Sequence, residues 1–221
     1  MRKVLDIVSS KHSSVKRNYE KRMRENKVYY MKKAKKYDKD YWDGSRKSGY
    51  GGYKFIDGYW KDVAIKLIKK YDLNHKSRVL DVGCGKGFLL YELKKIIPEI
   101  IVRGLDISSY AIKNSHKDIK KFLKIQKAQS RYVFKKNYFD LVISLGCVHN
   151  LEIYDLKKCI NEMTRVSKKQ FIMTESYRND KELFNLQCWA LTCESFFSPK
   201  EWKWIFNEFN YFGDYELIYF E

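Results

Sequence analysis

One stretch, residues 78–87 with the sequence RVLDVGCGKG, limits the folds open to this chain more than any other. Val79, Leu80 and Val82 are the apolar and β-branched residues of a buried strand. An acid ends the run, three glycines spaced two apart follow, and apolar residues then recur at helical spacing from Phe88. Glycine allows turn conformations closed to other residues and lets the backbone approach a ligand. We therefore expect a strand, a ligand-binding turn and a helix.

The glycine spacing separates this turn from two phosphate-binding motifs. The pattern is D-x-G-x-G-x-G, whereas dinucleotide sites use G-x-G-x-x-G and phosphate loops end in Gly-Lys-Ser/Thr. Nineteen residues beyond Gly87, a second apolar run ends in Asp106. A carboxylate at the end of that strand can accept hydrogen bonds from ribose hydroxyls. The two runs together predict a ligand that contains a nucleoside.

Three motifs in order resemble those of the class I S-adenosylmethionine-dependent methyltransferases. They lie at residues 79–87, 104–108 and 138–144, and the resemblance covers about residues 37–221. It implies an α/β fold: a Rossmann-like, doubly wound, mostly parallel sheet flanked by helices. It also implies S-adenosyl-L-methionine as methyl donor and S-adenosyl-L-homocysteine as product.

The resemblance further implies a donor site at the strand ends. Its residues would be Tyr37, Trp42, Asp81, Gly83, Cys84, Gly85, Gly87, Asp106, Ile107, Gln129 and Leu145. One position departs from the family pattern, in which an acid commonly follows the third strand and accepts a hydrogen bond from the adenine amino group. Residues 127–130 read Lys-Ala-Gln-Ser instead. The side-chain carbonyl of Gln129, or backbone groups, would take that role.

Length and composition indicate a single soluble domain. A chain of 221 residues with 44% hydrophobic content can bury one core but not two. No apolar run approaches the roughly 20 residues of a membrane span, and no long apolar segment opens the chain, so we expect a cytoplasmic protein. The five cysteines are scattered and never in C-x-x-C spacing, which predicts reduced thiols and no zinc site.

The formal charge of +18 is concentrated near the N-terminus, because residues 1–50 hold 16 Lys and Arg against 6 Asp and Glu. Residues 1–36 have a weak helical pattern, so we treat them as a basic helical extension of a methyltransferase domain at residues 37–221. The extension either binds something acidic or is a solvated, partly disordered arm. AT-rich coding alone produces abundant lysine, and we favour the second interpretation.

Residues 37–60 are rich in aromatics and contain five glycines with little regular period, which predicts a structured lid. The resemblance implies that this segment folds over the methionine part of the donor, with Tyr37 and Trp42 at that place. The alternative is that rings such as Phe55 and Trp60 pack against the sheet edge as core.

Two further strands of the expected sheet deliver polar residues to their ends. The strand at 138–145 leads to His149, and the strand at 170–174 leads to Glu175. Open parallel sheets bind ligands beyond the carboxyl ends of their strands. A neutral His149 can take the proton of an acceptor hydroxyl, and Glu175 is a second candidate base. A histidine that caps a helix and an ion pair between Glu175 and Arg178 are the alternatives.

We expect the acceptor to be a small acidic molecule, because arginines lie near the expected site. The residues predicted to contact it are Arg46, Tyr50, Tyr53, Asn150, Tyr177 and Arg178. The runs YWDG, YGGYK and LTCESFFSPKEW resemble small bacterial methyltransferases of surface-polysaccharide pathways, so O-methylation of a sugar or nucleotide sugar is the first hypothesis. N-methylation of a small amine or amino acid, RNA methylation with the basic arm on the phosphates, and a non-catalytic binding subunit are the others.

The end of the chain predicts a shortened sheet. Only one strand, at residues 215–220, follows the last expected helix, whereas many relatives close the sheet with two. An edge left bare in this way would be exposed or would pair with a partner, as in a homodimer.

Overall fold

The computed structural model describes residues 3–13 and 16–221, and within them one sheet of six parallel strands forms the centre of the fold. The strand order β3-β2-β1-β4-β5-β6 confirms the doubly wound α/β fold. The strands are β1 (Arg78–Val82), β2 (Ile101–Asp106), β3 (Leu123–Ile125), β4 (Leu141–Leu145), β5 (Gln170–Glu175) and β6 (Asp214–Ile218). The order reverses between β1 and β4, and such a switch point opens a crevice at the carboxyl ends of the strands.

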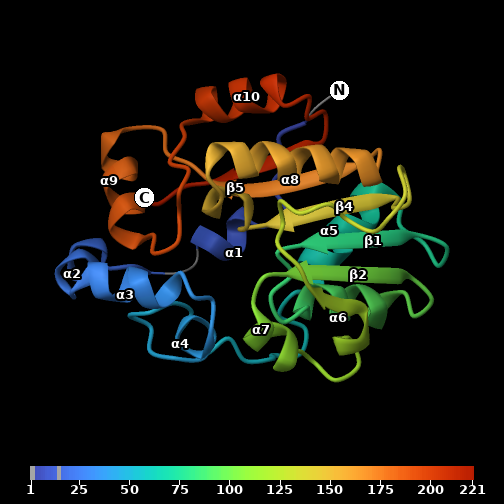
Figure 1. Cartoon of the computed structure of the whole chain (residues 1–221), viewed down its shortest axis with the longest axis horizontal. Helices are drawn as coiled ribbons and strands as arrows, with labels where there is room; N and C mark the ends of the chain where they lie inside the picture. Colours follow the sequence, from blue (N-terminus) through green and yellow to red (C-terminus); the bar gives the residue numbers. More distant parts are fainter. Residues whose placement is uncertain (1–2, 14–15) are drawn as a thin grey trace.

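Helices cover both faces of this sheet (Figure 1). Helices α5 (Lys61–Tyr71) and α6 (Phe88–Ile96) bury apolar residues in one core, and α8 (Ile153–Val166) and α10 (Pro199–Glu208) bury theirs in the other. Because the central strands are apolar on both faces, each face needs such a cover. Helix α10 begins at a capping box formed by Ser198 and Glu201, with Pro199 as the first helical residue.

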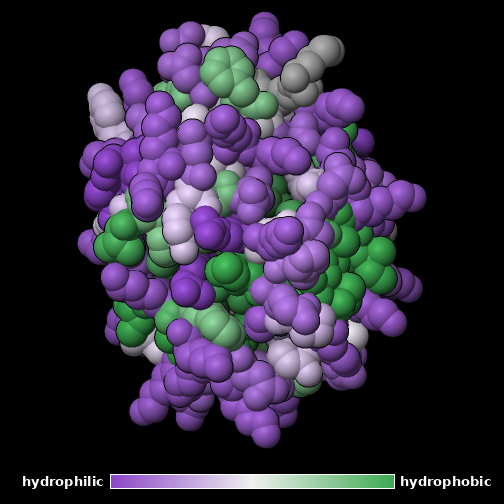
Figure 2. Space-filling view, turned by 90° about the vertical axis from the view of Figure 1, so that its right-hand side faces the viewer, coloured by the Kyte–Doolittle hydropathy of each residue, from purple (hydrophilic) through white to green (hydrophobic). Residues whose placement is uncertain are grey.

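The basic N-terminal part of the chain packs against this domain. It forms the helices α1 (Ser9–Ser13), α2 (Tyr19–Arg24) and α3 (Lys27–Ala34), and α4 (Lys39–Trp42) follows. Figure 1 shows α2 to α4 side by side at one end of the molecule, with α9 (Asp180–Trp189) beside α2. The face at the opposite end is mostly hydrophilic, with a group of hydrophobic residues toward the right edge of the view and smaller ones elsewhere (Figure 2).

The outer edge of β6 is covered by the chain's own N-terminal segment, which corrects the expectation of a bare edge. Leu5 N donates to Tyr215 O (2.8 Å), and Tyr215 N donates to Lys3 O (3.0 Å). Next to this pairing, the buried carboxylate of Glu216 accepts hydrogen bonds from Ile7 N and Val8 N, both at 2.8 Å. The argument for a homodimer from an unpaired edge therefore does not hold.

Two elements near the carboxyl ends of the strands and at the start of β4 are short. Helix α7 begins after its N-cap Ser108 and covers only Ser109–Lys113. Ser115 Oγ donates to Ile112 O (2.7 Å), and such local side-chain bonds compete with a continuing helix. The strand expected at 138–145 begins at Leu141, after Asn137 with a left-handed φ of 55°.

Residues 3–13 and 16–221 contain neither a membrane-spanning helix nor a metal-binding cluster. None of the helices there has both the length and the apolar character needed to cross a membrane. No cluster of three or more His, Cys, Asp or Glu there has an arrangement that could hold a metal ion.

Candidate functional site

The glycine loop between β1 and α6 has the left-handed conformation that its sequence predicts. Gly83, Gly85 and Gly87 have φ values of 81°, 54° and 72°. A Cβ at Gly83 would lie 2.4 Å from Cys147 Cβ, and one at Gly85 would lie 2.7 Å from the Trp42 ring. The loop therefore needs glycine both for its backbone angles and for the space above it.

Asp106, at the end of β2, is joined to this loop. Its carboxylate accepts hydrogen bonds from Gly85 N (2.7 Å) and Ser108 N (2.8 Å) and is buried. Burial raises the pKa of Asp106, and these two backbone hydrogen bonds oppose the rise. Each carboxylate oxygen has a further lone pair, so the group can still accept bonds from a ligand.

Asp81, at the end of β1, is a buried carboxylate that lacks a partner. It is 5% exposed, and its Oδ1 has no hydrogen-bond partner. Burial, together with the nearby charge of Asp106, raises the pKa of Asp81 to about 8. A cationic ligand group beside Asp81 would satisfy this oxygen and stabilise the carboxylate.

A cavity of about 490 Å³ opens at the carboxyl ends of β1, β4 and β5. That volume is within the range of small-molecule sites. It brings together eleven of the residues predicted from the sequence: Trp42, Arg46, Tyr50, Tyr53, Asp81, Gly83, Cys84, Gly85, Leu145, His149 and Glu175. The glycine loop forms one side of it, and the aromatic segment at residues 37–60 forms another.

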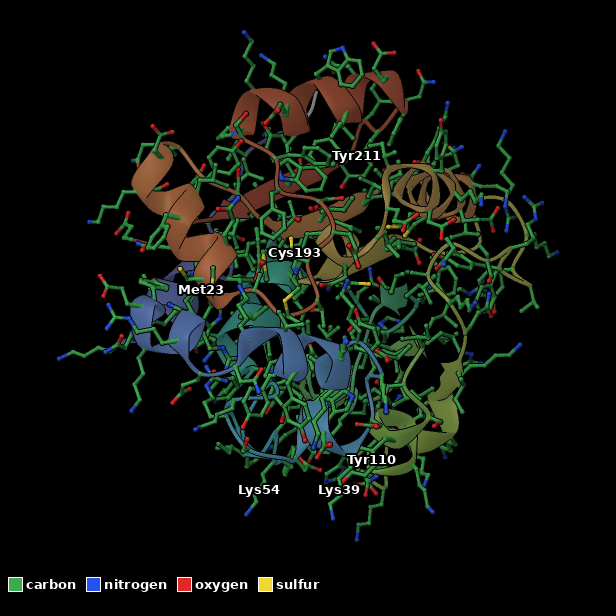
Figure 3. All side chains as sticks on the ribbon, turned by 60° about the vertical axis from the view of Figure 1, so that its left-hand side comes forward. Met23, Lys39, Lys54, Tyr110, Cys193 and Tyr211 are labelled. Carbon is green, nitrogen blue, oxygen red and sulfur yellow. The ribbon has the colours of Figure 1, made fainter. Side chains whose placement is uncertain are left out.

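The aromatic segment is held down on the glycine loop. Trp42 Nε1 donates to Ser108 Oγ (2.9 Å) and Tyr37 O (3.2 Å), and the Trp42 ring stacks on Tyr50 with centroids 5.2 Å apart. Tyr110 OH donates to Asp43 of this segment (2.9 Å), and Figure 3 places Tyr110 close to Lys39 of α4. The segment therefore covers the glycine loop as a lid.

His149 and Glu175 meet inside the cavity. Nε2 of His149 lies 3.5 Å from Glu175 Oε2, and Nδ1 lies 3.5 Å from Thr174 Oγ1. Burial lowers the pKa of His149, and the charge of Glu175 opposes this effect. The ring is therefore neutral at pH 7, in the state of a base.

The other residues predicted for the site do not line the cavity. They are Tyr37, Gly87, Asp106, Ile107, Gln129, Asn150, Tyr177 and Arg178. Arg178 is the clearest case, because its guanidinium forms ion pairs with Glu182 and Glu221 and does not line the cavity. The alternative pairing of Arg178 with Glu175 is also wrong, since Glu175 contacts His149.

The cavity is also lined by residues that sequence reasoning did not assign to the site, among them Arg17, Arg22, Met173 and Trp189. Arg17 and Arg22 belong to the basic N-terminal stretch that we interpreted as a solvated arm. The excess charge of residues 1–50 was the only signal for them. Trp189 is the last residue of α9, and no sequence motif marks it as part of a site.

Comparison with known proteins gives a family and several relatives. A family model described as a methyltransferase domain matches residues 73–210. The mitochondrial arginine-hydroxylase NDUFAF5 of Mus musculus is 28% identical over 109 residues, which cover 49% of this chain and 31% of that protein. Ribosomal RNA small subunit methyltransferase C of Buchnera aphidicola is 32% identical over 114 residues, covering 41% of this chain and 32% of that protein. The match thus spans about a third of either relative's length.

Among solved structures, the YcgJ protein of Bacillus subtilis superposes with a TM-score of 0.53 at 20% identity, covering 66% of each chain. At this level of identity the likeness establishes the fold alone.

Proposed function

Since the chain belongs to the methyltransferase domain family, we propose that it transfers the methyl group of S-adenosylmethionine to a hydroxyl oxygen of a small acceptor bound in the cavity. The observation that carries this proposal is the buried pair of His149 and Glu175, 3.5 Å apart in the same cavity as the glycine loop. A base is needed when the acceptor loses a proton as it reacts, as a hydroxyl does.

The residues at the glycine loop fit the donor. The buried Oδ1 of Asp81, which has no hydrogen-bond partner, would bind the ammonium group of the donor. The remaining lone pairs of Asp106 would accept hydrogen bonds from the ribose hydroxyls of the donor. Gly83 and Gly85 leave a cradle that a Cβ would fill. The donor supplies an electrophilic methyl group on a sulfonium sulfur. The remaining residues assigned to the donor are Tyr37, Trp42, Cys84, Gly87, Ile107, Gln129 and Leu145.

His149 acts on the acceptor side. Its neutral ring accepts the hydroxyl proton as the oxygen is methylated, and Glu175 stabilises the imidazolium that results. The lid formed by residues 37–60 excludes water and holds the acceptor. Positioning of this kind contributes up to roughly 7 to 11 kcal/mol for well-oriented reactants. We propose Tyr50, Tyr53 and Arg46 as acceptor contacts, because all three line the cavity.

The test has two stages. Calorimetric titration with S-adenosylmethionine should give micromolar binding, and Asp106→Ala should abolish it. A panel of sugars and nucleoside diphosphate sugars is then assayed for release of S-adenosylhomocysteine, with wild type and His149→Gln. Loss of turnover with donor binding intact supports the base. Unchanged turnover in His149→Gln removes His149 from the role of base.

RNA is the second candidate acceptor. One relative is a ribosomal RNA methyltransferase by name, and the formal charge of +18 suits a polyanion. This candidate requires binding of an RNA oligonucleotide that weakens steeply between 50 and 200 mM salt, about 10³-fold or more for six or more phosphate contacts. Salt-independent or absent binding excludes it.

A further inference from the structure

Three guanidinium groups gather around one indole ring in the cavity. The guanidinium carbons of Arg17, Arg22 and Arg46 lie 5.3, 5.2 and 5.0 Å from the centre of the Trp189 ring. All four residues line the cavity, although they come from three separate parts of the chain. Figure 3 shows how this arises, because α2, with Met23, lies against the end of α9.

Arg22 is buried, and one of its hydrogen-bond donors has no partner. Its side chain is 8% exposed, its Nη1 donates to Arg46 O (2.6 Å), and its Nε has no hydrogen-bond partner. Within the described parts of the chain, no carboxylate lies within 4.0 Å of the charged nitrogens of Arg22 or Arg46. Glu25, the acid nearest in sequence, pairs with Lys47 instead (3.4 Å).

For Arg22, the buried member of the cluster, this arrangement is unfavourable unless an anion completes it. Burial and repulsion by Arg46 lower the pKa of Arg22, and burial is also the main cause of a lowered pKa at Arg17. Buried charges are normally paired, because removing them from water costs several kcal/mol per ion. Several like charges around one space therefore indicate a ligand of high negative charge.

The position of the cluster relates it to the proposed reaction. The segment that follows Trp189 lines the same cavity at Leu191 and Cys193. It then binds His149, whose carbonyl oxygen accepts hydrogen bonds from Glu194 N (2.9 Å) and Ser195 N (3.0 Å). An acceptor anchored at the arginines would thus extend toward the His149 and Glu175 pair.

We propose that Arg17, Arg22 and Arg46 form a subsite for a phosphoryl group of the acceptor. Guanidinium groups bind phosphate oxygens through paired, planar hydrogen bonds, and three of them match a phosphate or diphosphate better than a single carboxylate. The Trp189 ring holds the guanidiniums in place by cation–π contacts. This inference rests on the proposed function and narrows the acceptor to a phosphorylated small molecule, such as a nucleoside diphosphate sugar.

Helix α2 supplies a matched control. Arg24 lies on the same helix as Arg22, but its side chain is 80% exposed and pairs with Glu20 at 3.2 Å. Arg24→Gln removes the same charge from the same helix outside the cavity. Long-range electrostatic effects are therefore common to both variants, and only the subsite contact differs.

The experiment is calorimetric titration with pyrophosphate, inorganic phosphate and malonate. Wild type and Arg24→Gln should bind pyrophosphate, and Arg22→Gln and Arg46→Gln should bind it at least tenfold more weakly. Titration of S-adenosylmethionine into the same variants should give a Kd within threefold of wild type, which shows that they are folded. Arg46→Gln serves as the second variant, since its side chain is exposed to the cavity and not part of the core.

Three outcomes overturn the proposal. One is equal pyrophosphate binding by Arg22→Gln, Arg46→Gln and Arg24→Gln. Another is tighter binding of malonate than of both phosphate probes, which would make the ligand a carboxylate. The third is binding of an RNA oligonucleotide with no binding of pyrophosphate. Pyrophosphate binding needs no methyl transfer. A result that overturns the phosphoryl subsite is therefore distinct from a result that overturns the proposed methyl transfer.

Discussion

The ammonium of Lys86, inside the glycine loop, lies 2.7 Å from the Asp43 carboxylate of the lid and 2.8 Å from Tyr53 O. Lys86 is 4% exposed, so the charge is buried and its hydrogen bonds go to the lid. The residue that stands between Gly85 and Gly87 thus fastens residues 37–60 to the glycine loop. The position of the lid and the shape of the glycine loop are coupled through this pair.

Replacing Lys86 with Met should loosen the lid. Breaking a buried pair leaves Asp43 partly buried without its cation, which we expect to cost about 1 to 3 kcal/mol in the free energy of unfolding. Donor affinity should fall as well, and denaturant melts with S-adenosylmethionine titrations measure both. Lys95→Met, which removes the exposed ion pair between Lys95 and Asp57, is the control. Equal effects of the two substitutions would contradict the coupling.

Gly85→Ala should remove donor binding. The new methyl group would lie 2.7 Å from the Trp42 ring at a φ of 54°. Gly58→Ala is the matched control, because Gly58 has a φ of 74° and open space at the Cβ position. In both variants alanine in the left-handed conformation costs about 1 to 2 kcal/mol. Only Gly85→Ala also fills the space between the glycine loop and the Trp42 ring. Thermal melts should therefore show a larger loss for Gly85→Ala, and titration with S-adenosylmethionine should fail for it alone.

Donor binding should release a proton near pH 7. Asp81, with a pKa raised to about 8, is mostly protonated there, and a cationic ligand group favours its ionised form. Affinity should therefore rise as the pH increases from about 6 to 8, by at most tenfold per pH unit. Calorimetry at pH 7 in buffers of different ionisation enthalpy measures the proton count, and Asp81→Asn should abolish the release. A buffer-independent enthalpy for the wild type would sink this prediction.

His12 should make the fold acid-sensitive. Its Nε2 contacts Tyr219 O (2.8 Å), and Arg17 donates to its Nδ1 (3.3 Å), which fixes a neutral ring. Burial and Arg17 lower the pKa of His12 from 6.5 to about 4. Between these values the unfolded chain binds more protons, so stability is fully present above pH 6.5 and is lost as the pH falls through 4.

The loss amounts to at most about 3 kcal/mol. His12→Gln should therefore narrow the difference in melting temperature between pH 7 and pH 4.5. His75→Gln, in an exposed loop, should leave that difference as it is in the wild type. A His12→Gln protein that remains as acid-sensitive as the wild type would argue against this role.

Local patterns in the sequence were enough for the fold and for the conformation of the glycine loop. The β1 run, its glycines and Asp106 are signals carried by neighbouring residues, and the structure places them as predicted. Arg178 was predicted to contact the acceptor because it follows a strand end, but its guanidinium pairs with Glu182, four residues on in the sequence. Local patterns could not predict the contact between Arg22 and Trp189, because it joins two helices and the two residues are 167 positions apart in the sequence.

The pairing of the N-terminal segment with β6 also affects the order in which parts of the protein form during synthesis. Ile7 and the Glu216 that binds its amide are 209 residues apart, so the ribosome makes the first long before the second. Arg17 is held by His12, which in turn contacts Tyr219 O beside that last strand. The glycine loop can form while synthesis continues, but the arginine side of the cavity cannot. Contacts of such long sequence separation also close slowly, so the arginine cluster is the last part of the site to mature on a newly made chain.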